Sequence, residues 1–319
     1  MATIGYHASH EQFTPSDLLG WVVRAEQAGF RAINSSDHFH PWSESQGQSG
    51  FSFAWLGAAM QATKLPFGVV CAPGQRYHPA IVAQATATLS QMFPGRFWIS
   101  LGSGEALNEN ITGERWITKE ERNARLKECG TVIKRLLQGE QVTHFGYTRT
   151  QEAKLYTRPS VQPLLLGAAV SKKTAGWMGS WAEGLITVSR PLPELKQVVR
   201  AFREGGGEGK PLYLKVQLSY DRSLEKALKG AHEQWRCNVL PADILDDLWQ
   251  VSQFDAAARF VREEDMRQMV LISTDHNEYI DTISAYADLG FEKIILHNVN
   301  REQEQFIGDF GEKVLPALH

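Results

Sequence analysis

The sequence predicts an α/β fold in which eight parallel strands, each followed by a helix, close a (β/α)8 TIM barrel. Apolar runs of strand length begin near Ile4, Ala32, Phe67, Phe97, Leu164, Leu185, Tyr213 and Ile294. Segments with apolar residues at helical spacing follow these runs. A doubly wound sheet is the alternative, but it should carry a glycine-rich phosphate loop after the first strand, where this chain has His7-Ala8-Ser9-His10.

The first half of the chain shows this alternation clearly. Ser16 is expected to be the N-cap of the first helix, which should stop at Gly29, and Pro79 suits the first turn of the third. The expected strands are 2–8, 31–37, 66–73 and 96–104, and the expected helices are 17–29, 53–63, 78–93 and 118–139.

In the second half, residues 141–157 alternate as a hairpin would, and residues 222–269 are helical in composition with no strand between the helices. We expect 222–269 to be a helical insertion before the last strand, within a single barrel domain that spans residues 1–319. The remaining expected strands are 163–169, 183–189, 211–220 and 291–299, and the remaining helices are 171–181, 195–202, 276–290 and 304–318.

The composition is that of an ordinary globular protein, with 43% hydrophobic and 22% charged residues among 319. A formal net charge of −3 argues against a general nucleic-acid binder. No apolar run approaches the roughly 18 residues of a membrane span, and the N-terminus does not resemble a secretion signal. Cys71, Cys129 and Cys237 are widely separated, which fits reduced thiols in a cytoplasmic protein.

Polar residues gather where the predicted strands end. Glu105 follows Gly102-Ser103-Gly104 at the end of the fourth strand, a position that favours chemistry in α/β proteins, although Glu105 could instead cap the next helix. His7 with Glu11, and Asp37 with His38, end the first two strands. Because barrel strands converge on one mouth, these side chains should meet there and exchange protons.

Two other patterns invite a binding hypothesis. His38 and His40 form an H-x-H pair that could bind zinc in a metal-dependent hydrolase, but later strand ends supply no further ligands, so we predict no metal site. Ser171 opens a helix beside Lys172, which could seat a phosphate group. The simpler interpretation of Ser171 is an N-cap beside solvated lysines.

Five runs resemble the luciferase-like flavin and deazaflavin oxidoreductases, most closely the branch that contains the deazaflavin (coenzyme F420)-dependent glucose-6-phosphate dehydrogenases: GYHASHEQF, SDHFHPW, RYHPAIVAQATATL, GSGEALNE and GSWAEGLITVS. The resemblance implies a barrel with a cofactor ring across its mouth. It implies catalytic roles for His38, Glu105, Trp42 and Glu11. It implies cofactor contacts from Asp37, Val70, Cys71, Ser103, Gly104, Asn108, Ala169, Val170, Ser171 and Lys172, and a non-proline cis peptide near Val69-Val70-Cys71.

The chain also departs from that branch. The basic residues that grip the sugar phosphate correspond to Pro191, a residue near Trp249, and Met269. Ala169-Val170-Ser171 replaces a Gly-Gly turn, which resembles the FMN-using members. Glucose 6-phosphate is therefore not expected as the substrate, and FMN is favoured over F420.

These observations predict a flavin-type oxidoreductase that transfers a hydride, or activates oxygen, on a small organic substrate, with His38 and Glu105 as an acid/base pair. The alternatives are an F420-dependent dehydrogenase of a sugar or alcohol, a metal-dependent hydrolase, and a flavin-binding or light-emission accessory protein without activity. The family resemblance further implies a homodimer.

Overall fold

The strands close a complete parallel barrel, as the alternating pattern predicts. The structure, a computed structural model, describes residues 2–318, with Ala242 and Asp243 described by their backbone alone. The ring runs β9-β11-β1-β2-β3-β4-β7-β8 and closes through pairing of β8 with β9. Its members are the eight strands expected from the sequence: β1 (Thr3–Ala8), β2 (Ala32–Ser35), β3 (Phe67–Cys71), β4 (Phe97–Leu101), β7 (Leu164–Ala168), β8 (Leu185–Val188), β9 (Leu212–Tyr220) and β11 (Lys293–Asn298).

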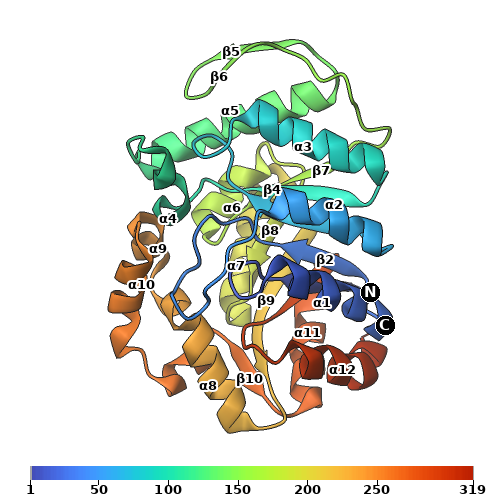
Figure 1. Ribbon diagram of the computed structural model, residues 1–319, viewed down its shortest axis with the longest axis vertical. Helices are drawn as coiled ribbons and strands as arrows, with labels where there is room; N and C mark the ends of the chain where they lie inside the picture. Colours follow the sequence, from blue (N-terminus) through green and yellow to red (C-terminus); the bar gives the residue numbers. More distant parts are fainter. Residues whose placement is uncertain (1, 319) are drawn as a thin grey trace.

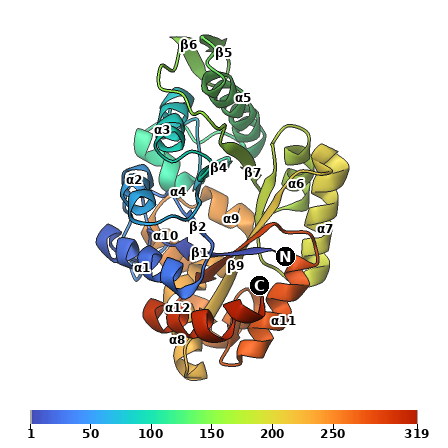
Figure 2. The ribbon, with the colours of Figure 1, turned by 90° about the vertical axis from the view of Figure 1, so that its right-hand side faces the viewer.

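Helices surround this ring, as Figures 1 and 2 show. The helices between ring strands are α1 (Pro15–Ala28), α2 (Ser52–Ala62), α3 (Pro79–Met92), α4 (Ala106–Glu109), α5 (Lys119–Leu137), α6 (Lys172–Gly179), α7 (Leu192–Phe202), α11 (His276–Ala287) and, after the last strand, α12 (Gln303–Lys313). The N-cap of α1 is Thr14, whose side chain accepts a hydrogen bond from the Asp17 N–H, so the Ser16 prediction is wrong. Pro15 fits the first helical position because it has no N–H to leave unpaired.

The segment after β9 forms short helices, as predicted for 222–269. They are α8 (Leu224–Trp235), η3 (Arg236–Val239), α9 (Ala242–Asp247), α10 (Val251–Ala257), η4 (Ala258–Phe260) and η5 (Glu263–Gln268). Buried Phe254 and Cys237 pack with Trp42 and Leu107, so the segment is anchored on the loops after β2 and β4. In Figure 1, α9 and α10 lie beside α4.

Two small strand features lie outside the ring. The predicted hairpin is β5 (Val142–Phe145) and β6 (Arg149–Ala153), which projects beyond α5 in both views. The strand β10 (Leu271–Ser273) pairs with β9 and was not predicted. Three residues are too few for a period of two to stand out from the neighbouring helices.

The lower part of the barrel is filled by side chains. Trp98, Leu166, Ile186, Tyr213 and Ile295 are buried together inside it. Gly68 is required beside them, because a Cβ there would lie 1.9 Å from Cε2 of Trp98. A barrel of this size is therefore a packed core below and has space for a ligand only at its mouth.

The third strand corrects one expectation of the family resemblance. Val70 pairs with Ser100 and Cys71 with Leu101 in regular parallel register, and residues 2–318 contain no cis peptide bond. The predicted cis peptide near Val69-Val70-Cys71 is therefore wrong. The regular β3–β4 ladder holds this part of the backbone in extended trans geometry, which is the default for a bond that does not precede proline. In the described part of the chain, no helix is both long and apolar enough to cross a membrane.

Candidate functional site

A cavity of about 1060 Å³ opens at the carboxyl ends of the barrel strands. All but one of the predicted site residues line it: His38, Trp42, Glu105, Asp37, Val70, Cys71, Ser103, Gly104, Asn108, Ala169, Val170, Ser171 and Lys172. Glu11 is absent from the lining and lies behind His38. Residues 238–241 and Leu245 of the inserted segment line the cavity from the other side, so the insertion completes the site.

His38 is held from the buried side by Glu11. Its Nδ1 lies 2.6 Å from Oε1 of Glu11, while Oε2 of Glu11 accepts hydrogen bonds from the hydroxyls of Ser9 (2.8 Å) and Ser36 (2.9 Å). Burial alone would lower the pKa of His38, but the charge of Glu11 and its hydrogen bond outweigh it and raise this pKa above the ordinary value. The Glu11 carboxylate therefore fixes the ring and favours the protonated imidazole.

Trp42 supports the other side of this ring. Its indole meets His38 edge to face, with ring centroids 5.4 Å apart, and meets Phe254 of α10 in the same manner at 5.3 Å. Trp42 thus joins the imidazole to the inserted segment. Because aromatic pairs of this geometry contribute modestly beyond their buried area, Trp42 orients His38 without adding a charge.

Glu105 faces His38 across the cavity. Its Oε2 lies 4.0 Å from Nε2 of His38, and burial raises the pKa of Glu105 to about 7, against the lowering effect of His38. Glu105 occupies the N-cap position of α4, as the helix-cap alternative had it, but its carboxyl makes no capping hydrogen bond within the described chain. Gly104 precedes it with φ +81°, a conformation that lets the chain turn and present the carboxyl to the cavity.

Asp37 has a structural environment that the sequence did not reveal. Oδ1 accepts hydrogen bonds from Ser52 (2.7 Å) and Tyr77 (3.2 Å), and Oδ2 from Nη2 of Arg76 (3.0 Å). Arg76 also lies 3.6 Å from Glu109 through its Nε, and its backbone N–H donates to the same carboxylate. This buried network ties the ends of β2, β3 and β4 together, and the predicted contact of Asp37 with a cofactor ring stays a prediction.

Asn108 and His40 hold the loop after β2. The amide oxygen of Asn108 accepts hydrogen bonds from the backbone N–H groups of Phe39 (2.8 Å) and His40 (3.1 Å), and Nδ1 of His40 lies 2.9 Å from the Leu107 carbonyl oxygen. His40 does not line the cavity, and no described cluster of His, Cys, Asp or Glu is arranged to hold a metal ion. The geometry therefore does not support the hydrolase alternative that pairs His38 with His40.

Small residues form one wall of the cavity. Ala72 and Gly102 directly follow β3 and β4, and Ala168 is the last residue of β7. The three lie at the same level of neighbouring strands. A Cβ added at Gly102 would meet nothing closer than 3.9 Å. Val70 and Cys71 continue this wall, and burial raises the pKa of the Cys71 thiol well above its ordinary value. The wall is therefore flat, uncharged and open to a planar ring.

Ser171 is the N-cap of α6, which is the simpler of the two interpretations of this helix start. The Ser171 hydroxyl accepts a hydrogen bond from the Thr174 N–H at 3.2 Å, as an N-cap does. Ala169, Val170 and Lys172 line the cavity beside it, so a phosphate seat remains a prediction. Pro191 and Met269 line the cavity as well, and Trp249 does not, so neutral side chains stand at these two positions.

Lys215 and Trp235 are among the cavity residues that the sequence analysis did not single out. Lys215 projects from β9, and Trp235 lies at the end of α8 with its ring centroid 5.6 Å from the Lys215 ammonium. The available signal was a single charged residue within the apolar run PLYLKVQLSY. Such a residue is rarely buried without a partner, and this rule would have singled it out.

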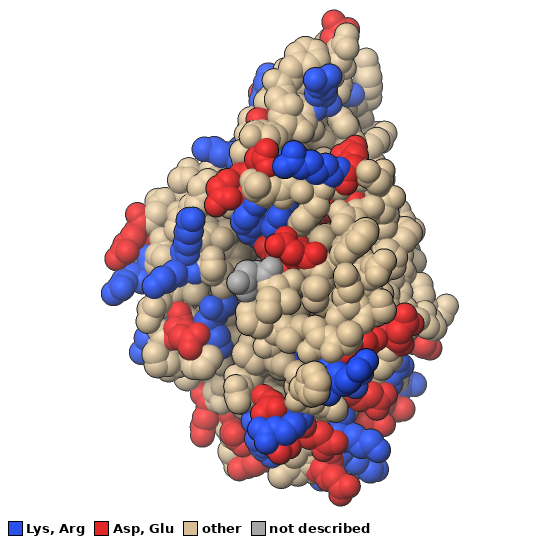
Figure 3. Space-filling model, turned by 90° about the vertical axis from the view of Figure 1, so that its left-hand side faces the viewer, with Lys and Arg blue, Asp and Glu red and all other residues tan. Residues whose placement is uncertain are grey.

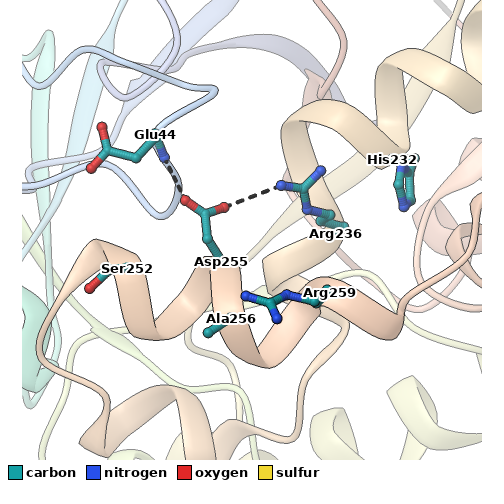
Figure 4. A pocket seen from close by; sticks show the side chains of 7 residues that line it. All are labelled: Glu44, His232, Arg236, Ser252, Asp255, Ala256 and Arg259. Atoms are coloured by element: carbon teal, nitrogen blue, oxygen red, sulfur yellow. Dashed lines mark hydrogen bonds and ion pairs between the residues drawn. The ribbon is translucent and has the colours of Figure 1, made fainter.

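A second, smaller cavity of about 450 Å³ lies on the inserted segment (Figure 4). Asp255 occupies its centre, accepting hydrogen bonds from the Glu44 N–H (3.1 Å) and from Nη2 of Arg236 (3.3 Å). Nε2 of His232 donates a hydrogen bond to the Val261 carbonyl oxygen at 2.7 Å. These contacts hold the loop after β2 against η3 and α10, and they form no facing acid/base pair.

On the face shown in Figure 3, Lys and Arg side chains are interspersed with Asp and Glu. This face therefore presents no large field of one sign.

Comparison with known proteins shows the family to which this chain belongs. The family described as "Luciferase-like monooxygenase" matches residues 1–293. An F420-dependent glucose-6-phosphate dehydrogenase from Microbacterium testaceum (strain StLB037) is 36% identical over 326 residues, covering 98% of this chain and 96% of that protein. One from Nakamurella multipartita (strain ATCC 700099) is 35% identical, with the same coverage.

A solved structure also resembles this fold over the whole chain. The F420-dependent secondary alcohol dehydrogenase in complex with an F420-acetone adduct has a TM-score of 0.93 and 32% identity, with complete coverage of both chains. These findings contradict the prediction of FMN as the cofactor, because these relatives are F420-dependent. A serine at the start of α6 is a common helix cap, so it could not identify FMN.

Proposed function

Because the chain belongs to the luciferase-like monooxygenase family and is an oxidoreductase, we propose that it is an F420-dependent dehydrogenase of a small hydroxyl compound. The observation that carries the proposal is the position of His38. It lies between the carboxylate of Glu11 and the carboxyl of Glu105, inside a cavity with one flat, uncharged wall.

The residues present fit a deazaflavin ring. Ala72, Gly102 and Ala168 leave open space at one level of three adjacent strands, so a planar ring can approach the backbone there. Ser103 and the rim residues 169–172 would hold the remainder of the cofactor. When bound, F420 supplies a ring that accepts or returns two electrons as a hydride.

The protein then handles the proton. In oxidation of an alcohol, the His38–Glu105 pair takes the hydroxyl proton, and in reduction of a ketone it returns that proton to the oxygen. Glu105, with its pKa raised to about 7, can hold or release a proton near neutral pH. Glu11 stays ionised, because the charge of His38 and its hydrogen bond hold the pKa of Glu11 well below its usual range despite burial.

A binding titration tests the cofactor. We expect F420 to bind the purified protein, with FMN as the comparison ligand binding more weakly, in an equilibrium titration followed by fluorescence. Addition of an oxidisable alcohol should then bleach the F420 absorbance. Tight FMN binding with no response to F420 would refute the proposal.

The pH profile of the Glu11→Gln variant provides a further prediction. Glu11 raises the pKa of His38, so the neutral imidazole that accepts a proton forms only above this raised value. Removing the charge lowers the pKa of His38, and the acid limb of kcat/KM for alcohol oxidation should move to lower pH. The measurement is a pH–rate profile, supported by NMR titration of His38.

Glu44→Gln is the matched control, since the exposed Glu44 side chain lies at the other cavity. Its acid limb should coincide with that of the parent. An unchanged limb in Glu11→Gln would show that the carboxylate of Glu11 does not tune the imidazole.

A further inference from the structure

Lys215 is a cation inside the site without a counter-ion. It sits within β9, in register with Val188 of β8 and Ile295 of β11, and lines the large cavity. Its ammonium lies 5.6 Å from the centroid of Trp235. It has no hydrogen bond and no ion pair with any residue whose side chain the structure describes.

The ionisable groups around Lys215 either have other partners or are at least partly neutral. The carboxylate of Glu11 is occupied by His38 and two serine hydroxyls, and Glu105 is close to half protonated near pH 7 because its pKa is about 7. The tilted rings of His7 and His297 have centroids 4.4 Å apart, and burial together with neighbouring positive charge lowers the pKa of each well below the ordinary value. Both imidazoles are therefore neutral, and Lys215 remains a cation without an ion pair to the described side chains.

A second group in the cavity also lacks a partner. Nδ2 of Asn238 is buried and donates no hydrogen bond to the described residues, and Asn238 lines the same cavity from the inserted segment. Buried donors and unpaired cations are unfavourable unless a ligand satisfies them. An ammonium and an amide N–H group that both lack acceptors indicate an anionic, oxygen-rich ligand.

We propose that Lys215 binds the carboxylate of the substrate and that the substrate is a short 2-hydroxy acid. This inference rests on the proposed function. Lys215, His38 and Glu105 line the same cavity, so a carboxylate on the Lys215 ammonium holds the adjacent carbinol carbon in the cavity with His38 and Glu105.

The reaction balances with the groups named. The carbinol C–H bond breaks and its two electrons leave with the hydrogen as a hydride to F420. The hydroxyl proton passes to the His38–Glu105 pair, and the product is a 2-oxo acid and reduced F420. Lys215 stays protonated throughout and positions the carboxylate.

Binding of an unreactive anion tests the site directly. Oxamate has the shape and charge of a short 2-oxo acid, and oxamide is its neutral counterpart. We expect oxamate, and not oxamide, to bind the F420-loaded protein in isothermal titration calorimetry. Lys215→Met should weaken oxamate by roughly 30-fold or more, the size expected when one member of a buried charge pair is removed.

Lys293→Met is the matched control. Lys293 lies on the neighbouring strand β11 at the opposite end of the barrel, where its ammonium donates to the Tyr213 hydroxyl. This variant should bind oxamate as the parent does. Equal oxamate binding by the parent and Lys215→Met, or equal binding of oxamate and oxamide by the parent, overturns the proposal.

Stability shows whether Lys215→Met folds. Replacing a partly buried cation that has no ion pair by an apolar side chain of similar length should leave the thermal midpoint equal to or above that of the parent. If Lys215→Met does not fold, Lys215→Gln takes its place in the titration.

A substrate panel separates this inference from the proposed function. The parent should oxidise 2-hydroxybutanoate with a higher kcat/KM than butan-2-ol or glucose 6-phosphate, and Lys215→Met should lose that preference. A parent that prefers butan-2-ol or glucose 6-phosphate refutes the hydroxy-acid assignment and leaves the dehydrogenase proposal standing. If none of the three reduces F420 while oxamate binding depends on Lys215, the anion site stands and the dehydrogenase proposal falls.

Discussion

Replacing His38 by alanine is expected to lower kcat/KM for F420-dependent oxidation by about 10²–10⁴-fold, the range typical of a lost acid/base group. The reason is geometric. The imidazole is the group that connects the buried carboxylate of Glu11 to the cavity, and its Nε2 faces Glu105 at 4.0 Å. Steady-state rates at saturating F420, with F420 affinity measured in parallel, distinguish loss of proton transfer from loss of cofactor binding.

His40→Ala is the control, because His40 lies two residues away and contacts the Leu107 carbonyl oxygen outside the cavity. Its turnover should stay within a few-fold of the parent. If His38→Ala also stays within a few-fold, the assignment of His38 is wrong.

Replacing Arg76 by methionine is expected to lower the free energy of unfolding by about 3–5 kcal/mol at neutral pH, as for other buried pairs that lose one member. Arg76 is buried between Asp37 and Glu109, and its Nη2 also donates to the Asp37 carbonyl oxygen at 2.7 Å. Removing the guanidinium leaves two buried carboxylates facing each other's charge. Denaturant unfolding followed by circular dichroism measures the change.

Arg24→Met serves as the comparison for Arg76→Met. Arg24 pairs with Glu304 on the surface, where both side chains are at least half exposed. Surface pairs of this kind contribute about 0–1 kcal/mol, so the midpoint should barely move. Similar losses in the two variants would mean that the Arg76 network is not a buried ion cluster in solution.

Sequence reasoning brought the predicted residues to one barrel mouth, where all but Glu11 line the cavity, because they stand at or just after strand ends. A strand end is visible locally, as an apolar run followed by glycine or polar residues, and the barrel rule then assigns these ends to one mouth. His38, Glu105 and the rim near Ser171 could all be placed in this way. The cofactor could not be chosen by the same reasoning, because the Ser171 cap is a general feature of helix starts and carries no information about the ring.

The partners of the predicted residues were beyond the reach of the sequence. Asp37 was expected to face a cofactor, yet Ser52, Tyr77 and Arg76 occupy its carboxylate from positions 15 to 40 residues away. Lys215 was overlooked because an isolated lysine in an apolar strand reads as an ordinary edge or surface residue. Whether it meets a counter-ion depends on side chains from other strands.

The sequence by itself determined the order of strands and helices, the barrel and the set of polar strand ends, because periodicity and strand-end chemistry are local properties of the chain. Only the tertiary structure decided which of those polar groups are satisfied and which face the cavity. That division arises because pairing and burial depend on residues far apart in sequence, as with Glu11 behind His38 and Lys215 without an anion. These long-range relations set the protonation of the site.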